Sequence, residues 1–170
     1  MEFYELVRRR RSVRAYKLDP VEEEKLMRIL EAGRLAPSAA NKQPWHFIVV
    51  KDAKVKEQLR KAYDREWFVK APVVIVVCAD PSAAWRRRDG EEYWKVDAAI
   101  AMEHIILAAA NEGLGTCWIG AFDEKVVKEV LSIPEHIRVV AMTPLGYAAE
   151  EKGPVTDRKP LEQIVHFDKW

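Results

Sequence analysis

The chain has few of the residues that mark several common classes of protein. Its 170 residues include two cysteines, Cys78 and Cys117, and neither belongs to a CxxC pair. Both lie in apolar stretches, so we predict buried free thiols rather than a disulfide framework. The four histidines lack the spacing of metal ligands such as HExxH, and we therefore expect no metal site.

Long apolar runs and an excess of charge of one sign are also absent. The longest apolar run, residues 71–79, is too short to cross a bilayer, and no signal peptide is visible at the start. The net charge is +1 although 32% of the residues are charged, so no global field favours nucleic acid or an anionic membrane. We expect a soluble, cytoplasmic protein without a nucleic-acid or membrane partner.

Hydrophobic residues make up 49% of the chain, which is enough for the core of one globular domain over residues 1–170. Apolar spacing and capping residues predict the helices: one from Phe3 into Arg8, one from Asp19-Pro20 to Pro37, one after Asp52, one at 95–112 and one at 124–131 capped by Asp123. Strands are expected at 46–50, 72–78, 116–119 and 137–147. No GxGxxG or GxxxxGK[ST] motif is present, so we predict a mixed α/β fold in which helices cover a central sheet.

Two segments near the start offer groups that could hold a ligand. Arginine and serine side chains at Arg10, Arg11, Ser12 and Arg14 could bind phosphate oxygens through charge-assisted hydrogen bonds. The alternative is a solvated basic helix end. The loop over 36–45 combines donors and acceptors with two small alanines that let a flat ring approach the backbone. Its alternative is an ordinary turn.

Two later segments have similar potential. Gly120 follows a predicted strand, where a glycine lets the backbone approach a ligand, although a plain strand-to-helix turn would look the same. Arg158 and Lys159 form a basic pair in an extended tail, and surface charge is the alternative. The tail also carries apolar residues that need a surface to bury against, for which a partner subunit is one candidate: Leu161, Ile164, Val165, Phe167 and Trp170.

Taken together and in this order, the segments RRSVRAY, APSAANKQPWHFIVV, LGTCWIGAF and DRKPLEQIV resemble the nitroreductase / NAD(P)H:flavin oxidoreductase family over residues 3–165. The resemblance implies an α+β (mixed α/β) fold with a mostly antiparallel central sheet covered by helices. It implies a homodimer with FMN at the subunit interface and a C-terminal tail that extends onto the partner. It also implies NAD(P)H as electron donor and a nitroaromatic, quinone or flavin as the small-molecule acceptor.

The resemblance also assigns residues to parts of FMN, and it places the chemistry on the cofactor rather than on a catalytic side chain. The phosphate and ribityl end would face Arg10, Arg11 and Ser12, with Arg158 as a further phosphate ligand and Lys159 beside it. Arg14 would lie near the pyrimidine edge, and the backbone of Ile119 and Gly120 would face N5. The other subunit would supply Pro37, Ser38, Ala39, Asn41 and Gln43.

The chain departs from the family pattern in two places. Many members carry a polar or basic flavin contact before the central strand, but residues 64–68 offer no assignable contact. The segment that shapes substrate pockets is reduced to 81–94, which could line the pocket or form a solvated lid. Two other functions stay open: a flavin-binding carrier or sensor without turnover, and a nucleic-acid module using Arg8–Arg11 and Arg86–Arg88, against which the balanced charge argues.

Overall fold

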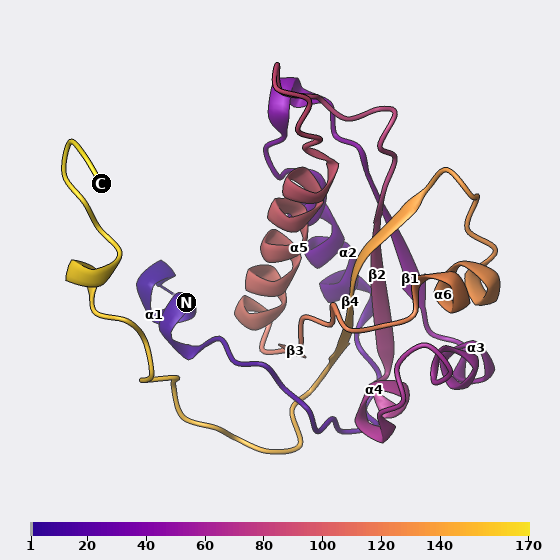
Figure 1. Cartoon of the computed structure of the whole chain (residues 1–170). Helices are drawn as coiled ribbons and strands as arrows, with labels where there is room; N and C mark the ends of the chain where they lie inside the picture. Colours follow the sequence, from indigo (N-terminus) through magenta and orange to yellow (C-terminus); the bar gives the residue numbers. More distant parts are fainter. Residues whose placement is uncertain (1) are drawn as a thin grey trace.

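Four β-strands pair in one antiparallel sheet at the centre of the molecule, in the order β1-β2-β4-β3 (Figure 1). The computed structural model describes residues 2–170. The strands are β1 (Trp45–Val50), β2 (Val73–Ala79), β3 (Gly115–Thr116) and β4 (Arg138–Gly146). The helices are α1 (Phe3–Arg9), α2 (Glu23–Arg34), α3 (Ala53–Leu59), α4 (Glu66–Lys70), α5 (Trp94–Asn111) and α6 (Glu124–Leu131), with 3-10 turns η1 (Ala39–Asn41) and η2 (Leu161–Gln163). The predicted mixed fold with an antiparallel central sheet is confirmed.

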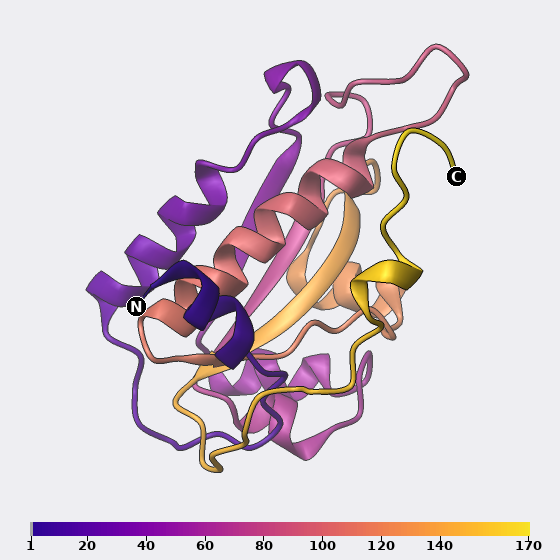
Figure 2. The same ribbon diagram turned by 90° about the vertical axis from the view of Figure 1, so that its left-hand side faces the viewer.

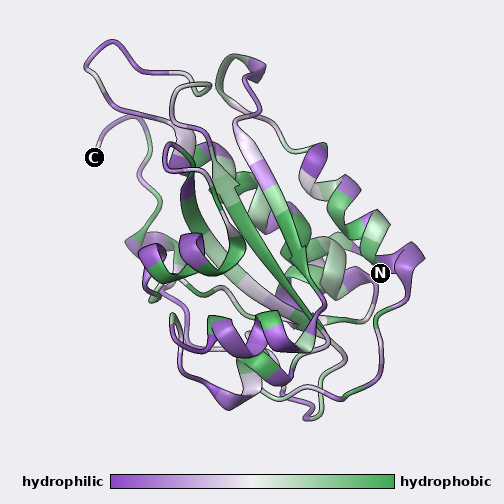
Figure 3. Cartoon of the chain, turned by 90° about the vertical axis from the view of Figure 1, so that its right-hand side faces the viewer, coloured by the Kyte–Doolittle hydropathy of each residue, from purple (hydrophilic) through white to green (hydrophobic). Residues whose placement is uncertain are grey.

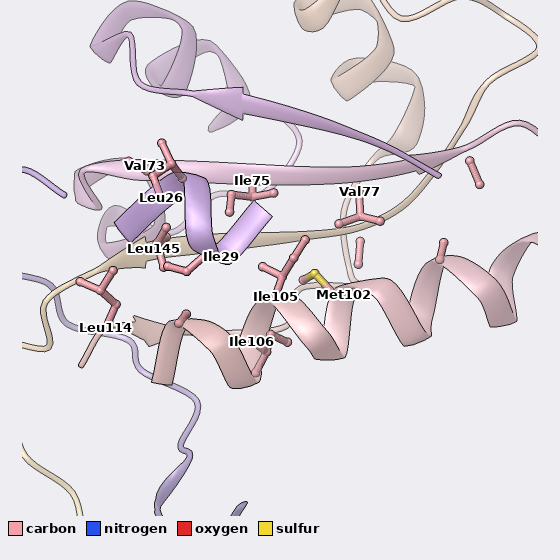
Figure 4. Packing of buried hydrophobic residues seen from close by; sticks show 14 of the residues in the cluster. Leu26, Ile29, Val73, Ile75, Val77, Met102, Ile105, Ile106, Leu114 and Leu145 are labelled. Carbon is pink, nitrogen blue, oxygen red and sulfur yellow. The ribbon is translucent and has the colours of Figure 1, made fainter. Parts of the chain in front are cut away.

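Helices cover both faces of the sheet, so its central strand is buried on two sides. All seven residues of β2 are buried, as expected for a continuous apolar run. Its odd-numbered residues face α2 and α5, where Val73, Ile75 and Val77 pack against Met102 and Ile105 (Figure 4). Its even-numbered residues face α3, α4 and α6, which lie on the other side of the sheet (Figure 1). The alternation gives the domain one core on each face.

The longest helix, α5, lies within a residue of its predicted range. Small side chains at Ala98, Ala101 and Ala109 are fully buried and let the helix lie close to the sheet. Hydrophobic colouring marks the central strands, whereas the loop that precedes α5 is hydrophilic (Figure 3). The position of this helix matters for function, because the candidate site residues gather near its two ends.

Several local predictions are confirmed. Asp52 caps α3, since its carboxylate accepts the backbone N–H groups of Lys54 and Val55. Asp123 caps α6 by accepting the Val126 N–H. Cys78 and Cys117 are buried free thiols. These features follow from short-range sequence signals, which explains why they could be recognised in advance.

The predicted start of α2 at Asp19-Pro20 is wrong. The helix begins at Glu23, and the preceding Glu22 makes no side-chain cap to the helix backbone. Its carboxylate accepts a hydrogen bond from the hydroxyl of Tyr147, just past the end of β4, with 2.6 and 2.7 Å between the oxygens. The same hydroxyl accepts from Lys25 at 2.7 Å. Glu22 at the start of the helix therefore bonds to Tyr147, which lies 125 positions away in the sequence. Capping rules use only neighbouring residues, so they cannot predict such a contact.

Two further boundaries differ from the prediction. Strand β3 contains only Gly115 and Thr116 instead of 116–119, because the Cys117 N–H donates to the Thr143 side chain rather than to a backbone carbonyl. The chain then rejoins β4 at an isolated bridge between Ile119 and Met142. Helix α4 was not predicted, and it buries Phe68 and Val69. Phe68 therefore belongs to the core, whereas Asp64, Arg65 and Glu66 are exposed.

The carboxylate of Glu124 makes stability depend on pH. Paired hydrogen bonds from Arg138 at 2.8 and 2.9 Å hold its pKa below the ordinary 4.5, against the opposing effect of burial. A carboxyl whose folded-state pKa is depressed stabilises the fold above its unfolded pKa and loses that contribution as pH falls through the folded value. We expect Glu124→Gln to lower the free energy of unfolding by about 1 kcal/mol at pH 7.

The difference between wild type and Glu124→Gln should shrink progressively below pH 4.5, as the wild-type carboxyl takes up its proton. Urea unfolding at pH 7 and pH 3 measures it. The matched control is Glu129→Gln on the same helix, because Glu129 forms no ion pair within residues 2–170. An equal difference at both pH values would show that the effect comes from packing and not from the charge.

Candidate functional site

A cavity of about 370 Å³ lies at the C-terminal end of α5. Its walls come from the segment after α1, from β3 and from the start of the tail, and they include Arg10, Arg11, Ser12, Arg14, Gly115, Thr116, Glu150, Glu151 and Lys152. The first wall is extended chain, because α1 ends at Arg9 and Ser12 pairs with Thr116 in a parallel bridge. The predicted alternative of a basic helix end therefore holds only for Arg8 and Arg9.

Two contacts fix the extended segment against the body. The Val13 N–H donates to the Thr116 carbonyl at 2.8 Å, and the Tyr16 hydroxyl donates to the Val13 carbonyl at 2.7 Å. Burial raises the pKa of Tyr16, so the phenol stays protonated and remains a donor at neutral pH. These hydrogen bonds hold the backbone that carries the arginine side chains in place without a bound ligand.

Among the described residues, three of the arginines that line the cavity are free of carboxylate partners, whereas the fourth, Arg9, pairs with Glu5 at 3.2 Å. Within residues 2–170, Arg10, Arg11 and Arg14 form no ion pair with a carboxylate, although Glu150 and Glu151 also line the cavity. Arg11 Nη1 donates to the Gly153 carbonyl at 2.8 Å. Unpaired guanidinium groups around a serine hydroxyl form a donor set suited to a phosphate ester. This is the chemistry expected of an anion pocket.

Cys117 lies beside this cluster but is not an activated thiol. Burial raises its pKa, and the nearby Arg14 and Ser12 only partly oppose that effect. A thiol with a raised pKa is protonated at neutral pH and is a poor nucleophile. The structure therefore supports packing rather than catalysis for this residue, as the sequence suggested.

The second group of predicted residues lies near the opposite end of α5. Pro37, Ser38, Ala39, Asn41 and Gln43 belong to the loop around η1, and the Ala39 N–H donates to Asp97 in the first turn of α5 at 2.9 Å. Figure 2 shows α1 beside one end of the helix and η1 toward the other. Because α5 has 18 residues, its ends are about 27 Å apart. One chain does not bring the two groups together.

The predicted backbone segment at Ile119 and Gly120 is open to a ligand. Ile119 is buried and exchanges both backbone hydrogen bonds with Met142, at 2.9 and 3.0 Å. Gly120 is exposed, and its N–H donates to no acceptor within residues 2–170. Only Trp118 Nε1, at 3.8 Å, lies within 4 Å of the place where a side chain would begin. The bridge to Met142 therefore fixes the backbone at Ile119, and the next residue, Gly120, has an N–H donor that is free in the described part of the chain.

The tail does not bring Arg158 and Lys159 to the cavity. Both are exposed, and Arg158 donates only to the carbonyl of its neighbour Asp157 at 2.9 Å. Figure 1 shows the last part of the tail standing away from the domain. Its large apolar side chains are exposed as well: Leu161, Ile164, Val165, Phe167 and Trp170. The predicted extension onto a partner subunit stays a prediction.

Comparisons with known proteins decide the family. The model of the nitroreductase family matches residues 7–67 and 60–147. This chain belongs to the nitroreductase family. A protein of Archaeoglobus fulgidus whose name joins NADH dehydrogenase with NAD(P)H nitroreductase is 38% identical over 99% of both chains. The crystal structure of a nitroreductase family protein from Clostridium difficile 630 matches with a TM-score of 0.93 and 31% identity over 100% of both chains.

A solved structure described as an FMN-dependent nitroreductase, from Clostridium difficile R20291, matches this nitroreductase-family chain with a TM-score of 0.82. The two are 34% identical, and the match covers 97% of this chain and 98% of the other. Within residues 2–170 no cluster of three or more metal-ligating side chains occurs. No described helix is both long and apolar enough to cross a membrane.

Sequence reasoning missed Asp97, the acidic residue that accepts the Ala39 N–H in this nitroreductase-family chain. Asp97 is buried in α5, but in the sequence an acidic residue in the first turn of a helix looks like an ordinary surface charge. The segment at 81–94 also leaves from this end of the sheet, since the Asp80 N–H donates to the Pro44 carbonyl at 2.8 Å. It forms a small hairpin in which Trp85 and Tyr93 meet edge to face at 4.9 Å.

The close approach of β3 to the arginine segment gives a stability prediction. A Cβ atom at Gly115 would lie 2.6 Å from Val13 Cγ2 and 2.9 Å from Val13 Cβ. We expect Gly115→Ala to lower the free energy of unfolding by about 1–3 kcal/mol through overpacking, as measured by urea unfolding. Gly153→Ala is the control, because, apart from its chain neighbours, no described residue lies within 4 Å of its Cβ position. Equal stability of the two variants would contradict the close packing of Val13 on Gly115.

Proposed function

We propose that this protein is an FMN-dependent NAD(P)H oxidoreductase that works as a homodimer. The observation that carries the proposal is the division of the candidate ligands into two groups near opposite ends of α5, a helix about 27 Å long. A second copy related by two-fold symmetry can supply the missing group to each site. The family membership and the relatives named as oxidoreductases support the same conclusion.

The residues present fit FMN. The phosphate requires several hydrogen-bond donors, and Arg10, Arg11 and Ser12 provide them in a cavity of about 370 Å³, where neither arginine is paired with the lining carboxylates Glu150 and Glu151 within residues 2–170. Arg158 and Lys159 would add positive charge if the tail folds over the partner. Arg14 would stabilise negative charge at the pyrimidine edge of the flavin. Its positive charge would be held in position beforehand, as the donors of an oxyanion hole are.

Bound FMN supplies the hydride chemistry that amino-acid side chains lack. The chain would hold and orient it: the free N–H of Gly120 would donate to the ring edge, and Ile119 would keep that donor in place. The loop of Pro37, Ser38, Ala39, Asn41 and Gln43 would contact the ring from the other subunit. NAD(P)H and a nitroaromatic, quinone or flavin acceptor would then bind in turn at one open face.

Purified protein tests this proposal directly. We expect a yellow dimer from which FMN can be released and identified by its absorption spectrum and chromatography. Oxidation of NADH or NADPH should require an added acceptor, and double-reciprocal plots should give parallel lines because the two substrates use one site in turn. A colourless protein that ignores added FMN would refute the proposal, and a yellow dimer without turnover would indicate a flavin carrier or sensor instead.

A further inference from the structure

Asp97 is a buried carboxylate with an unusual environment. Its side chain is 1% exposed, and Oδ1 accepts the Ala39 N–H at 2.9 Å. The second oxygen, Oδ2, is also buried and has no hydrogen-bond partner within residues 2–170. Burying a polar atom without a partner opposes folding. The presence of an acid here therefore calls for a reason beyond packing.

The loop that Asp97 contacts has an uncommon backbone. Ala40, Asn41 and Gln43 have φ values of 49°, 53° and 50°, a left-handed region that residues with a Cβ atom avoid. Internal hydrogen bonds help to hold this shape: the Gln43 N–H donates to Ser38 Oγ at 2.9 Å, and Gln43 Nε2 donates to the Asn41 carbonyl at 3.1 Å. These bonds define the form of the loop but not its place on the protein.

Asp97 attaches the loop to α5. Within residues 2–170, its bond to Ala39 is the one hydrogen bond that joins residues 38–43 to another helix or strand. Apolar packing of Ala36 and Trp45 against Ala101 fixes only the two ends of the loop. Without the bond to Asp97, only the packing at its two ends would hold residues 38–43 against the sheet and α5.

We propose that Asp97 is a positioning residue, which anchors the 38–43 loop so that the loop meets FMN bound to the second subunit in a fixed arrangement. This inference rests on the proposed function, since it gives the loop its ligand. Asp97 itself would touch neither FMN nor substrate. It would act through Ala39, and its loss would free a loop whose strained backbone needs support from outside.

Two substitutions distinguish the need for a carboxyl group from the need for a hydrogen-bond acceptor at this position. Asp97→Ala removes the acceptor, whereas Asp97→Asn keeps an oxygen that can accept the Ala39 N–H. The control is Lys56→Met, which removes another buried charged side chain, one that donates to the Ala71 and Pro72 carbonyls at 2.6 and 3.0 Å on the other face of the sheet. The control should lower the melting temperature without affecting the loop.

Two measurements on the purified holoprotein report on the loop. Lys42 is exposed, so the initial rate of trypsin cleavage after Lys42 reports how often the loop leaves its native position. Retention of FMN during serial dilution gives its dissociation constant. For Asp97→Ala we expect cleavage at least 5-fold faster and FMN binding at least 10-fold weaker, whereas Asp97→Asn should stay within about 3-fold of wild type on both.

Three results would overturn the proposal, and a fourth would overturn the proposed function instead. Wild-type cleavage and FMN retention in Asp97→Ala would overturn the proposal, and so would faster cleavage with unchanged FMN binding, because the anchored loop would then not serve the ligand. Faster cleavage in Lys56→Met to the same extent would also overturn it by showing a general loss of stability. If the wild type itself binds no FMN, the proposed function fails, whereas the cleavage rates still decide whether Asp97 anchors the loop.

Discussion

Replacement of Arg10 by alanine is expected to weaken FMN binding by about 10- to 100-fold, and the purified variant should be pale. A hydrogen bond to a charged group contributes about 1.5–3 kcal/mol, which corresponds to that range of dissociation constants. Arg10 lines the cavity and forms no ion pair within residues 2–170, so its loss leaves no carboxylate without a partner. Fluorescence titration of FMN against the dialysed protein measures the change.

Riboflavin and a neighbouring arginine provide the controls for this prediction. Riboflavin lacks the phosphate, so its binding should change little, and Arg10→Ala should lose most of the preference for FMN. Arg8→Ala removes an exposed arginine that does not line the cavity, and it should retain the yellow colour. If Arg10→Ala weakens FMN and riboflavin equally, Arg10 does not hold the phosphate.

Removal of the apolar side chains of the tail is expected to split the proposed dimer. Ile164 and Phe167 are 56% and 86% exposed in one chain, and burial of each against a partner would contribute about 1.5–3 kcal/mol. Ile164→Ser combined with Phe167→Ser should therefore raise the dimer dissociation constant by about 10²-fold or more. Sedimentation equilibrium over a range of protein concentrations measures this constant.

The tail offers its own control for that experiment. Glu162→Gln changes an exposed charged residue of the same tail without removing apolar surface, and its dimer constant should match the wild type. Far-UV circular dichroism should show the domain still folded in the double variant, since the tail contributes no residue to either core cluster. An unchanged dimer constant in the double variant would exclude the tail from the interface.

Much of the fold could be predicted from the sequence, because its strongest signals are local. The apolar run of β2, the caps at Asp52 and Asp123 and the long buried α5 each depend on residues close together in the chain. The start of α2 could not be predicted, since Glu22 bonds to Tyr147 across the molecule. The early end of β3 likewise depends on Thr143, in a strand that comes later.

The sequence predicted only those parts of the candidate site whose residues are neighbours in the chain. Arg10, Arg11, Ser12 and Arg14 lie together in one cavity because they are close neighbours on one extended segment. The link between Ala39 and Asp97 was missed, because 58 residues separate them and no local pattern pairs a loop amide with a helix carboxylate. Arg158 and Lys159 are exposed and lie outside the cavity in the single chain, so their predicted role in phosphate binding stays a prediction.

The separation of the arginine cavity from the η1 loop along α5 has a thermodynamic consequence. A ligand that needs both groups binds only the assembled pair of subunits, so cofactor occupancy and association are linked equilibria. Saturating FMN would hold the subunits together at protein concentrations where they otherwise separate.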